Sequence, residues 1–284
     1  MLFEWPDNLV TELAHKRCVI FLGAGISATA KNKDGNSPLT WGRFISEIKS
    51  ISRGNSLKYI DEMIAQQNYL PALQAIYDDT DPGRYSSFLK DKFQRPGFLP
   101  SPVHEAIKEL NSKIVVTTNF DKIYDGLCSE HGYIIANYND PIGKMVSTIK
   151  SPENLVIKAH GTIDDIDNLV FTEKQYYDAK ARYPEFYQIL NALFLTHTVV
   201  FLGYSLNDPD INLLLETASN SISKSSPHYV VIEEGAQTEK LKYWKDCYNI
   251  YALEYGPDYT HLPAKIEELK NLVATERIEK SLPQ

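Results

Sequence analysis

The stretch that decides the fold is Cys18-Val-Ile-Phe-Leu-Gly-Ala-Gly-Ile-Ser-Ala28, in which five apolar residues run into a glycine-rich turn. A continuous β-branched and aromatic run predicts a strand that is covered on both faces. The turn fits the pattern G-x-G-x-x-[GA]. Gly23 allows a sharp bend, and Gly25 leaves no side chain between backbone N–H groups and a phosphate. The stretch therefore predicts a strand followed by the phosphate-binding turn of a dinucleotide site.

The sequence after this turn does not continue as in a dinucleotide-dependent dehydrogenase. Such an enzyme has a regular helix and then a second strand that ends in an acidic residue about 20 residues on. This chain instead enters the polar loop Lys31-Asn-Lys-Asp-Gly-Asn-Ser-Pro38. Dinucleotide binding remains the interpretation, but hydride transfer does not follow from it.

Outward from the first strand, further apolar runs alternate with helical patterns. Strands are predicted at residues 18–22, 114–118, 133–138, 155–158, 199–202, 229–232 and 250–253. Helices are predicted between them and after them, at residues 8–16, 208–218, 238–247 and 261–273. This alternation predicts an α/β fold with a doubly wound, mostly parallel, Rossmann-like sheet, in a single domain over residues 1–284.

Residues 40–110, between the first two predicted strands, contain several helix starts and no convincing strand. Thr40 can cap a helix that begins at Trp41, and Pro71 occupies a first-turn position. Ser101 and Pro102 provide a cap and a first-turn proline for another helix. The segment is too long for one crossover helix, so we expect a helical insertion packed beside the sheet.

Polar residues follow three more of the predicted strands. Asn119 and Asp121 follow the second strand, His160 follows the fourth, and Gly203 and Ser205 follow the fifth. The carboxyl ends of parallel strands are where open α/β sheets bind ligands, so these residues form a candidate site together with Gly23.

Each of these residues also has a simpler interpretation. Asn119 or Asp121 can cap the helix that follows it. A lone histidine such as His160 is most often structural. The combination of residues at four strand ends is more specific than any one of them.

The overall composition excludes several classes of protein. The 284 residues are 43% hydrophobic, 11% aromatic and 23% charged, which excludes disordered, collagen-like and disulfide-scaffold chains. The formal net charge is −8, from 29 basic and 37 acidic residues, so direct nucleic-acid binding is not expected. No apolar run is long enough to cross a membrane, and the N-terminus lacks the features of a signal peptide, so we expect a cytoplasmic protein.

The three cysteines, Cys18, Cys128 and Cys247, are far apart and form no C-x-x-C pair. A structural zinc site usually draws its ligands from two closely spaced pairs. We therefore expect no zinc or other metal site, and expect the cysteines to be small buried residues in a reducing compartment.

Four motifs occur in the order of the sirtuin signatures: Gly-Ala-Gly-Ile-Ser at 23–27, Thr-Asn-Phe-Asp at 118–121, His-Gly at 160–161 and Gly-Tyr-Ser at 203–205. Over residues 15–255 the chain resembles the sirtuin-like domains of bacterial antiphage defence systems. Those domains also carry the late elements F-L-G-[YF]-S and D-x-[DN]-[IL].

The resemblance assigns roles to individual residues. It implies that Gly23, Gly25 and Ser27 surround the pyrophosphate and the nearer ribose of NAD+, and that Gly203 and Ser205 meet the adenosine half. Ala24 and Thr118 lie in the same motifs and complete the candidate cofactor-binding set. The catalytic candidates implied by the resemblance are Asn119 and Asp121 at the nicotinamide end and His160 as the catalytic histidine.

Departures from the sirtuin deacylases favour hydrolysis of NAD+ to nicotinamide and ADP-ribose. The chain lacks the zinc ribbon, has Ala28-Thr-Ala-Lys-Asn32 where deacylases have Pro-Asp-Phe-Arg, and has Thr118 where they have glutamine. Two alternatives remain open: a non-enzymatic sensor or assembly subunit that binds NAD+ or ADP-ribose, and an NAD-dependent protein deacylase.

An NAD+ hydrolase must be controlled, and only a short polar segment, residues 274–284, follows the last predicted helix. We therefore expect control by self-assembly as a homo-oligomer or by a partner protein. The resemblance implies a stand-alone domain partnered by a HerA-type ATPase, with an Argonaute-like protein as runner-up. Candidate contact surfaces are the helical insertion and Tyr176, Tyr177, Tyr183 and Tyr187, although these tyrosines can equally pack against their own domain.

Overall fold

The computed structural model describes residues 3–66, 68–204, 215 and 226–283. Within them lies a seven-stranded sheet of order β3-β4-β2-β1-β5-β6-β7, in which every neighbouring pair is parallel. The predicted doubly wound α/β fold is confirmed, and each predicted strand end agrees with the structure to within one residue. The strands are β1 (Cys18–Leu22), β2 (Ile114–Thr117), β3 (Ile134–Asn137), β4 (Leu155–Lys158), β5 (Thr198–Leu202), β6 (His228–Ile232) and β7 (Ile250–Glu254).

Strand β1 is the central strand, and the order of connection reverses beside it. The chain first adds β2, β3 and β4 on one side of β1 and then adds β5, β6 and β7 on the other. Leu22 at the end of β1 pairs with Thr117 of β2 and with Leu202 of β5. Open α/β sheets bind ligands outside the carboxyl ends of the strands at such a reversal. The glycine-rich turn after Leu22 lies at this point.

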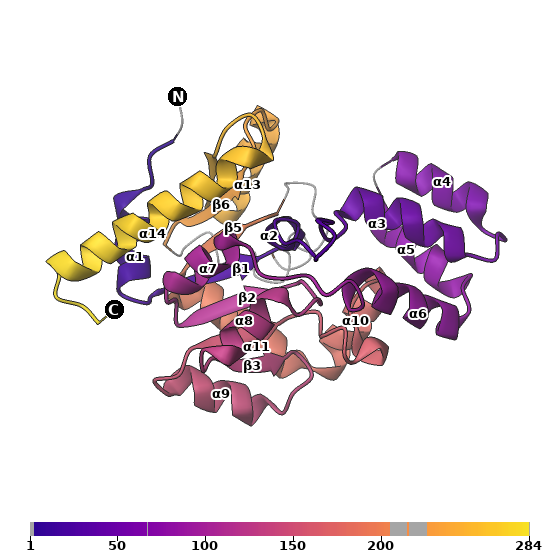
Figure 1. Cartoon of the computed structure of the whole chain (residues 1–284), viewed down its shortest axis with the longest axis horizontal. Coiled ribbons are helices and arrows are strands. Elements are labelled where there is room, and N and C mark those ends of the chain that lie inside the picture. Colours follow the sequence, from indigo (N-terminus) through magenta and orange to yellow (C-terminus); the bar gives the residue numbers. More distant parts are fainter. Residues whose placement is uncertain (1–2, 67, 205–214, 216–225, 284) are drawn as a thin grey trace.

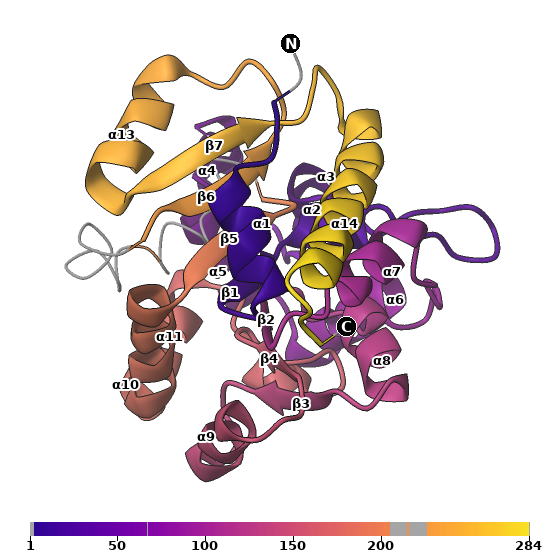
Figure 2. The ribbon, with the colours of Figure 1, turned by 90° about the vertical axis from the view of Figure 1, so that its left-hand side faces the viewer.

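Alternate residues of the strands enter two hydrophobic clusters, one on each face of the sheet. Phe21 and Phe201 belong to one cluster, whereas Ile20 and Val200 belong to the other. Figure 2 shows α10, α11 and α13 on one side of the sheet and α7, α8 and α14 on the other. The first face is covered by α9 (Ile142–Lys150), α10 (Glu173–Arg182), α11 (Pro184–Thr196) and α13 (Thr238–Tyr248), and the second by α1 (Asp7–Ala14), α7 (Pro102–Glu109), α8 (Ile123–Glu130) and α14 (Leu262–Glu279).

A group of helices between β1 and β2 forms a lobe beside the sheet, on the right of Figure 1. The short α2 (Ala24–Ser27) comes first, and the lobe follows as α3 (Trp41–Ile48), η1 (Lys49–Ile51), α4 (Leu57–Ala65), α5 (Tyr69–Asp78) and α6 (Pro82–Phe93). These helices share a third hydrophobic cluster, to which Ile163, Leu169 and Phe171 contribute from the segment after β4. The lobe is therefore packed against the loop that follows His160.

The predicted helix starts in this region are present. Helix α3 begins after Thr40, although the Thr40 side chain makes no capping hydrogen bond. Pro71 lies in the first turn of α5, and Pro102 begins α7. The predicted helix at residues 208–218 lies almost entirely outside the described residues.

The four tyrosines considered as a contact surface differ in exposure. Tyr176 and Tyr187 are buried in the cluster between the sheet and its helices, whereas Tyr177 is 54% exposed. Tyr183 is partly buried and packs against the same cluster. Packing within their own domain, the alternative interpretation, therefore accounts for three of the four.

Candidate functional site

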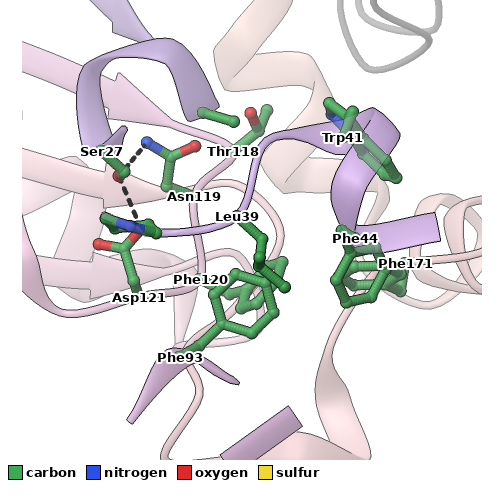
Figure 3. A pocket seen from close by; sticks show the side chains of 12 residues that line it. Ser27, Leu39, Trp41, Phe44, Phe93, Thr118, Asn119, Phe120, Asp121 and Phe171 are labelled. Atoms are coloured by element: carbon green, nitrogen blue, oxygen red, sulfur yellow. Dashed lines mark hydrogen bonds between the residues drawn. The ribbon is translucent and has the colours of Figure 1, made fainter. Parts of the chain in front are cut away.

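Ser27, Asn119 and Asp121 meet at the carboxyl ends of β1 and β2 (Figure 3). The Ser27 hydroxyl donates to Asp121 Oδ2 at 2.7 Å. Asn119 Nδ2 donates to Ser27 Oγ at 3.0 Å and to the Gly23 carbonyl at 2.9 Å. The structure thus brings together three residues that the sequence analysis selected from two separate motifs.

These hydrogen bonds fix the orientation of the Asn119 amide. A carbonyl oxygen such as that of Gly23 can only accept, so the amide nitrogen must face it. Both amide protons are then used, and Asn119 Oδ1 points away from Ser27 (Figure 3). This oxygen is an acceptor that can orient a hydroxyl group or a water molecule.

The Asp121 carboxylate accepts hydrogen bonds both from helix α8 and from the Ser27 hydroxyl. Its Oδ1 accepts from the backbone N–H of Ile123 at 3.0 Å, in the first turn of α8. The capping interpretation is therefore correct for Asp121, while Oδ2 is bonded to Ser27. A carboxylate offers about four acceptor positions, so these two bonds do not exhaust it. The residue is 6% exposed.

Thr118 connects this cluster to the end of β5. Its hydroxyl lies 3.1 Å from the Tyr204 hydroxyl, which also donates to the Leu22 carbonyl at 3.0 Å. In the sequence, Tyr204 is the middle residue of the Gly-Tyr-Ser motif and has no predicted role. In the structure it joins the ends of β1, β2 and β5.

The space beside the glycines is occupied by the protein itself. Gly23 N–H donates to the Leu202 carbonyl at 2.9 Å, and Gly25 N–H donates to the Gly203 carbonyl at 2.8 Å. A Cβ atom on Gly25 would lie 2.7 Å from that carbonyl oxygen, and one on Gly203 would lie 2.5 Å from the Ile26 nitrogen. Gly203 also has a φ of +74°, which favours glycine. The two turns therefore need glycine for their mutual contact, and these two N–H groups are engaged within the fold.

A pocket of about 500 Å³, open mouth included, lies in front of the Ser27–Asn119–Asp121 cluster. One side, here called the polar wall, consists of Ser27, Thr118, Asn119 and Asp121. The other, here called the aromatic wall, consists of Trp41, Phe44, Phe93, Phe120 and Phe171, with Pro38, Leu39 and Ala24 completing the lining. The lining therefore offers aromatic faces on one side and hydrogen-bonding groups on the other.

The aromatic wall is a continuous set of ring contacts. Phe93 and Phe120 have centroids 4.6 Å apart, and Phe171 lies 4.9 Å from both Phe44 and Phe120. Trp41 lies 5.7 Å from Phe171. Sequence analysis did not identify this wall, because its members come from separate segments without a common motif.

A second, wider cleft of about 2020 Å³, open mouth included, adjoins the pocket. Ala24 and Trp41 line both cavities. Gly25 and Gly203 line only the cleft, and its far side consists mainly of residues after β6, including Glu233, Glu234 and Lys240. The candidate residue Ser205 lies outside the described residues.

His160 lies at the predicted place, two residues beyond β4, but it lines neither cavity. The residue is 4% exposed, and burial lowers the pKa of its imidazole to about 4. The ring is therefore neutral at pH 7. Gly161 has a φ of +82°, and a Cβ atom there would lie 2.9 Å from the Asn168 carbonyl oxygen, so the turn after His160 requires glycine.

Cys18 and Cys128 are buried, and burial raises the pKa of both thiols, that of Cys128 to about 12. Cys247 is exposed, so the expectation that all three cysteines are buried was wrong for this one. Its place near the end of the amphipathic helix α13 puts it on the solvent side. Across the described ranges, no three His, Cys, Asp or Glu side chains are grouped as metal ligands. In the same ranges, no helix is both long and apolar enough to span a bilayer.

Comparison with known proteins gives a consistent result. Residues 113–253 match the family model of the SIR2-like domain. Defense-associated sirtuin 2 of Bacillus subtilis is 26% identical over 242 residues, which cover 80% of this chain and 22% of that protein. Two proteins named NAD(+) hydrolase ThsA are also similar. The one from Acinetobacter baumannii (strain 532279) is 26% identical over 211 residues, covering 74% of this chain and 40% of that protein. The one from Enterococcus faecium is 25% identical over 221 residues, covering 76% and 43%.

The chain spans less than half the length of each of these relatives. A solved structure described as "Structural Basis for the Mechanism and Regulation of Sir2 Enzymes" aligns over 98% of this chain and 99% of that one, with a TM-score of 0.48 and 14% identity. The family match includes Asn119, Asp121 and His160, and it confirms the resemblance drawn from the motifs. Residues 113–253 of this chain are therefore similar to the SIR2-like domain.

Proposed function

We propose that this chain is an NAD+ glycohydrolase, which cleaves NAD+ to nicotinamide and ADP-ribose and acts by depleting NAD+ in antiphage defence. The relatives named as a defence-associated sirtuin and as NAD(+) hydrolases support this assignment. The observation that carries it is the pocket in which the polar wall faces the aromatic wall, next to the wider cleft.

The reaction needs few groups. The bond between C1′ of the ribose and the pyridinium nitrogen breaks, and its electron pair goes to that nitrogen, so nicotinamide leaves as a neutral molecule. A water molecule then forms a bond to C1′ and gives up a proton. The sum is NAD+ plus water to nicotinamide, ADP-ribose and one proton. The protein must bind the ring, stabilise positive charge on the ribose and orient the water.

The residues of the pocket suit these tasks. The aromatic wall can bind the flat nicotinamide ring, and a pyridinium cation is attracted to aromatic faces. The buried Asp121 carboxylate provides negative charge opposite, where charge develops on the ribose. Asn119 Oδ1, whose direction is fixed by the two amide hydrogen bonds, orients the water or a ribose hydroxyl.

The remaining half of the dinucleotide would occupy the wider cleft. Ala24 and Trp41 belong to both cavities, so a ligand can extend from one to the other. The Glu233 and Glu234 carboxylates along this cleft are suited to accept hydrogen bonds from ribose hydroxyls. The role of His160 as proton acceptor stays a prediction, because the ring lines neither cavity.

One experiment tests the proposal. Purified protein is incubated with NAD+, nicotinamide release is followed by chromatography, and NAD+ binding is measured by calorimetry. We expect release that Asn119→Ala abolishes and that Asn271→Ala, an exposed change on α14, leaves unchanged. Binding without release would instead identify a subunit that binds NAD+ or ADP-ribose. Release only in the presence of an acyl-lysine peptide would identify a deacylase.

Control by assembly also stays a prediction. The hypotheses are a homo-oligomer, a HerA-type ATPase partner and an Argonaute-like partner. Under each of them, turnover should depend on assembly state. Light scattering together with the NAD+ assay, with and without the proteins encoded beside this one, measures that dependence. A strict monomer with full activity alone would contradict it.

A further inference from the structure

Lys158, the last residue of β4, is the least exposed lysine or arginine among the described residues, at 1%. Its ammonium donates to Asp125 Oδ1 on α8 at 2.9 Å and to the backbone carbonyl of Asp121. The exposed fractions of the Lys158 and Asp125 side chains are 1% and 8%. No sequence motif pointed to this lysine, and none of the steps above uses it.

A buried ion pair is weak evidence for a role in stability. Removing two charges from water costs several kcal/mol per ion, and an apolar pair of similar volume is often as stable or more stable. The Lys158–Asp125 pair alone could therefore be replaced by two apolar residues. The hydrogen bond to the Asp121 carbonyl could not, because an apolar side chain has no donor for it.

The position of Lys158 connects the main parts of the candidate site. Its backbone pairs with Thr117 at the end of β2, and it precedes His160 by two residues. Its ammonium spans to the loop that carries Asn119 and Asp121. The Asp121 carboxylate is already fixed by Ser27 and Ile123, so the Lys158 bond fixes the backbone of the same residue.

We propose that Lys158 is a positioning residue, whose ammonium holds the Asp121 backbone so that the Asp121 carboxylate and Asn119 face the ligand correctly. This proposal rests on the proposed function. Asp125 is the counterion of this ammonium, and it lines neither cavity.

Three variants and a matched control separate positioning from stability. Lys158→Met removes the donor and leaves Asp125 unpaired, Lys158→Met/Asp125→Leu replaces the ion pair by an apolar pair, and Asp125→Asn removes the counterion but keeps the Lys158 nitrogen as a donor to the Asp121 carbonyl. The control is Lys265→Met, because the Lys265 ammonium likewise donates to a carbonyl, that of Phe3, and to a carboxylate, that of Glu268, both at 2.8 Å. Lys265 lies on α14, away from the pocket lining.

We expect Lys158→Met to lower both the melting temperature and kcat. The double variant should recover the melting temperature but retain a loss of kcat of roughly 100-fold, with KM within about threefold of wild type, as expected for a lost orienting contact. In Asp125→Asn the loss of kcat should be roughly tenfold, which is smaller than the loss in the double variant. Lys265→Met should keep wild-type kcat. If the double variant recovers kcat along with its melting temperature, or if Asp125→Asn loses as much kcat as the double variant, Lys158 has only a structural role.

A binding measurement separates this proposal from the proposed function. The ratio of the Kd values for NAD+ and ADP-ribose reports on the nicotinamide end alone. If the wild type binds NAD+ without releasing nicotinamide, the proposed function fails. The ratio of the two Kd values then shows whether Lys158 positions the nicotinamide end of the site. A change of roughly fivefold or more in the double variant, absent in Lys265→Met, supports positioning, whereas an unchanged ratio overturns it. If the wild type binds no NAD+, both proposals fail together.

Discussion

The two walls of the pocket are built on different principles. The polar wall has each side chain in a defined hydrogen bond: Ser27 to Asp121, Asn119 to Gly23, and Thr118 to Tyr204. The aromatic wall is joined by ring contacts at centroid distances of 4.6 to 6.2 Å. Hydrogen bonds require particular atoms at particular places, whereas ring packing accepts any large apolar side chain of similar shape. We therefore expect the polar wall to determine the rate of reaction and the aromatic wall to determine which ligand binds.

The strongest test of this difference is the loss of the Asn119 amide. Asn119→Ala removes the oxygen that orients the reacting hydroxyl and also the bonds to Gly23 and Ser27, so we expect nicotinamide release to fall by about 10³-fold. The melting temperature should change little, because the side chain is only partly buried. Chromatography of the products and a thermal melt measure the two quantities. Near wild-type turnover in a folded Asn119→Ala protein would contradict the assignment.

His160 is the next largest expected effect. His160→Ala should lower kcat by about 10²-fold if the imidazole accepts a proton in the reaction. A neutral imidazole can accept a proton throughout the range from pH 6 to 9, and burial keeps His160 neutral there. The rate of a folded His160→Ala protein is compared with that of His261→Ala, a change at an exposed histidine near α14. Equal rates in these two variants would show that His160 is a structural residue.

A change in the aromatic wall should act mainly on KM. Trp41→Ala removes a ring that lines both cavities, so KM for NAD+ should rise by about tenfold while kcat changes by less than about threefold. Trp41→Phe keeps an aromatic face and should retain most of the affinity. Steady-state kinetics of the three proteins give both constants. A loss confined to kcat would contradict the expectation that the aromatic wall determines ligand binding and the polar wall determines the rate.

Acid should lower the stability of the fold through three buried histidines that lie outside both walls of the pocket. Burial lowers the pKa of His104, His160 and His228 to about 4 in the folded protein. Since the unfolded pKa is near 6.5, the stability from keeping them neutral is complete above pH 6.5 and is lost as the pH falls toward 4. The free energy of unfolding should then fall by up to about 1.4 kcal/mol per pH unit per histidine.

Urea unfolding at pH 7.5 and pH 5.5 measures this slope. His104 accepts a hydrogen bond from the Ser101 N–H at Nδ1, and asparagine can also accept there, so His104→Asn is a suitable control. This variant should show a slope smaller by about one third. Equal stability of the wild type at the two pH values would contradict the prediction.

The sequence was sufficient for the sheet because its strands are covered on both faces. Such strands are continuous apolar runs, and each stands out from the polar loops around it. The sequence also predicted, from capping residues and prolines, helix starts between β1 and β2 that the structure contains. It could not give the orientation of the lobe, which depends on contacts between Phe44 and residues far along the chain such as Phe171.

The hydrogen-bonded residues of the candidate site could be predicted from the sequence, whereas its aromatic residues could not. Asn119 and Asp121 were selected because they follow a buried strand at the edge where open α/β sheets bind ligands, and Ser27 because it belongs to the Gly-Ala-Gly-Ile-Ser motif. Trp41 and Phe93 were missed, since an aromatic residue on an amphipathic helix is ordinary core composition. Lys158 was missed because a lysine at a strand end is normally exposed, and its burial follows only from the packing of β2, β3 and α8 around it.

The protein contains three tryptophans, and their surroundings differ greatly. Trp5 and Trp244 are 5% and 1% exposed, in the hydrophobic clusters on opposite faces of the sheet. Trp41 alone lies at the junction of the two cavities. A molecule that binds against Trp41 in either cavity alters the solvation of this indole, while the other two, which are buried, emit as a constant background. The chain thus contains an intrinsic fluorescent reporter of occupancy, and ligand screening can begin without a label and without knowledge of the reaction.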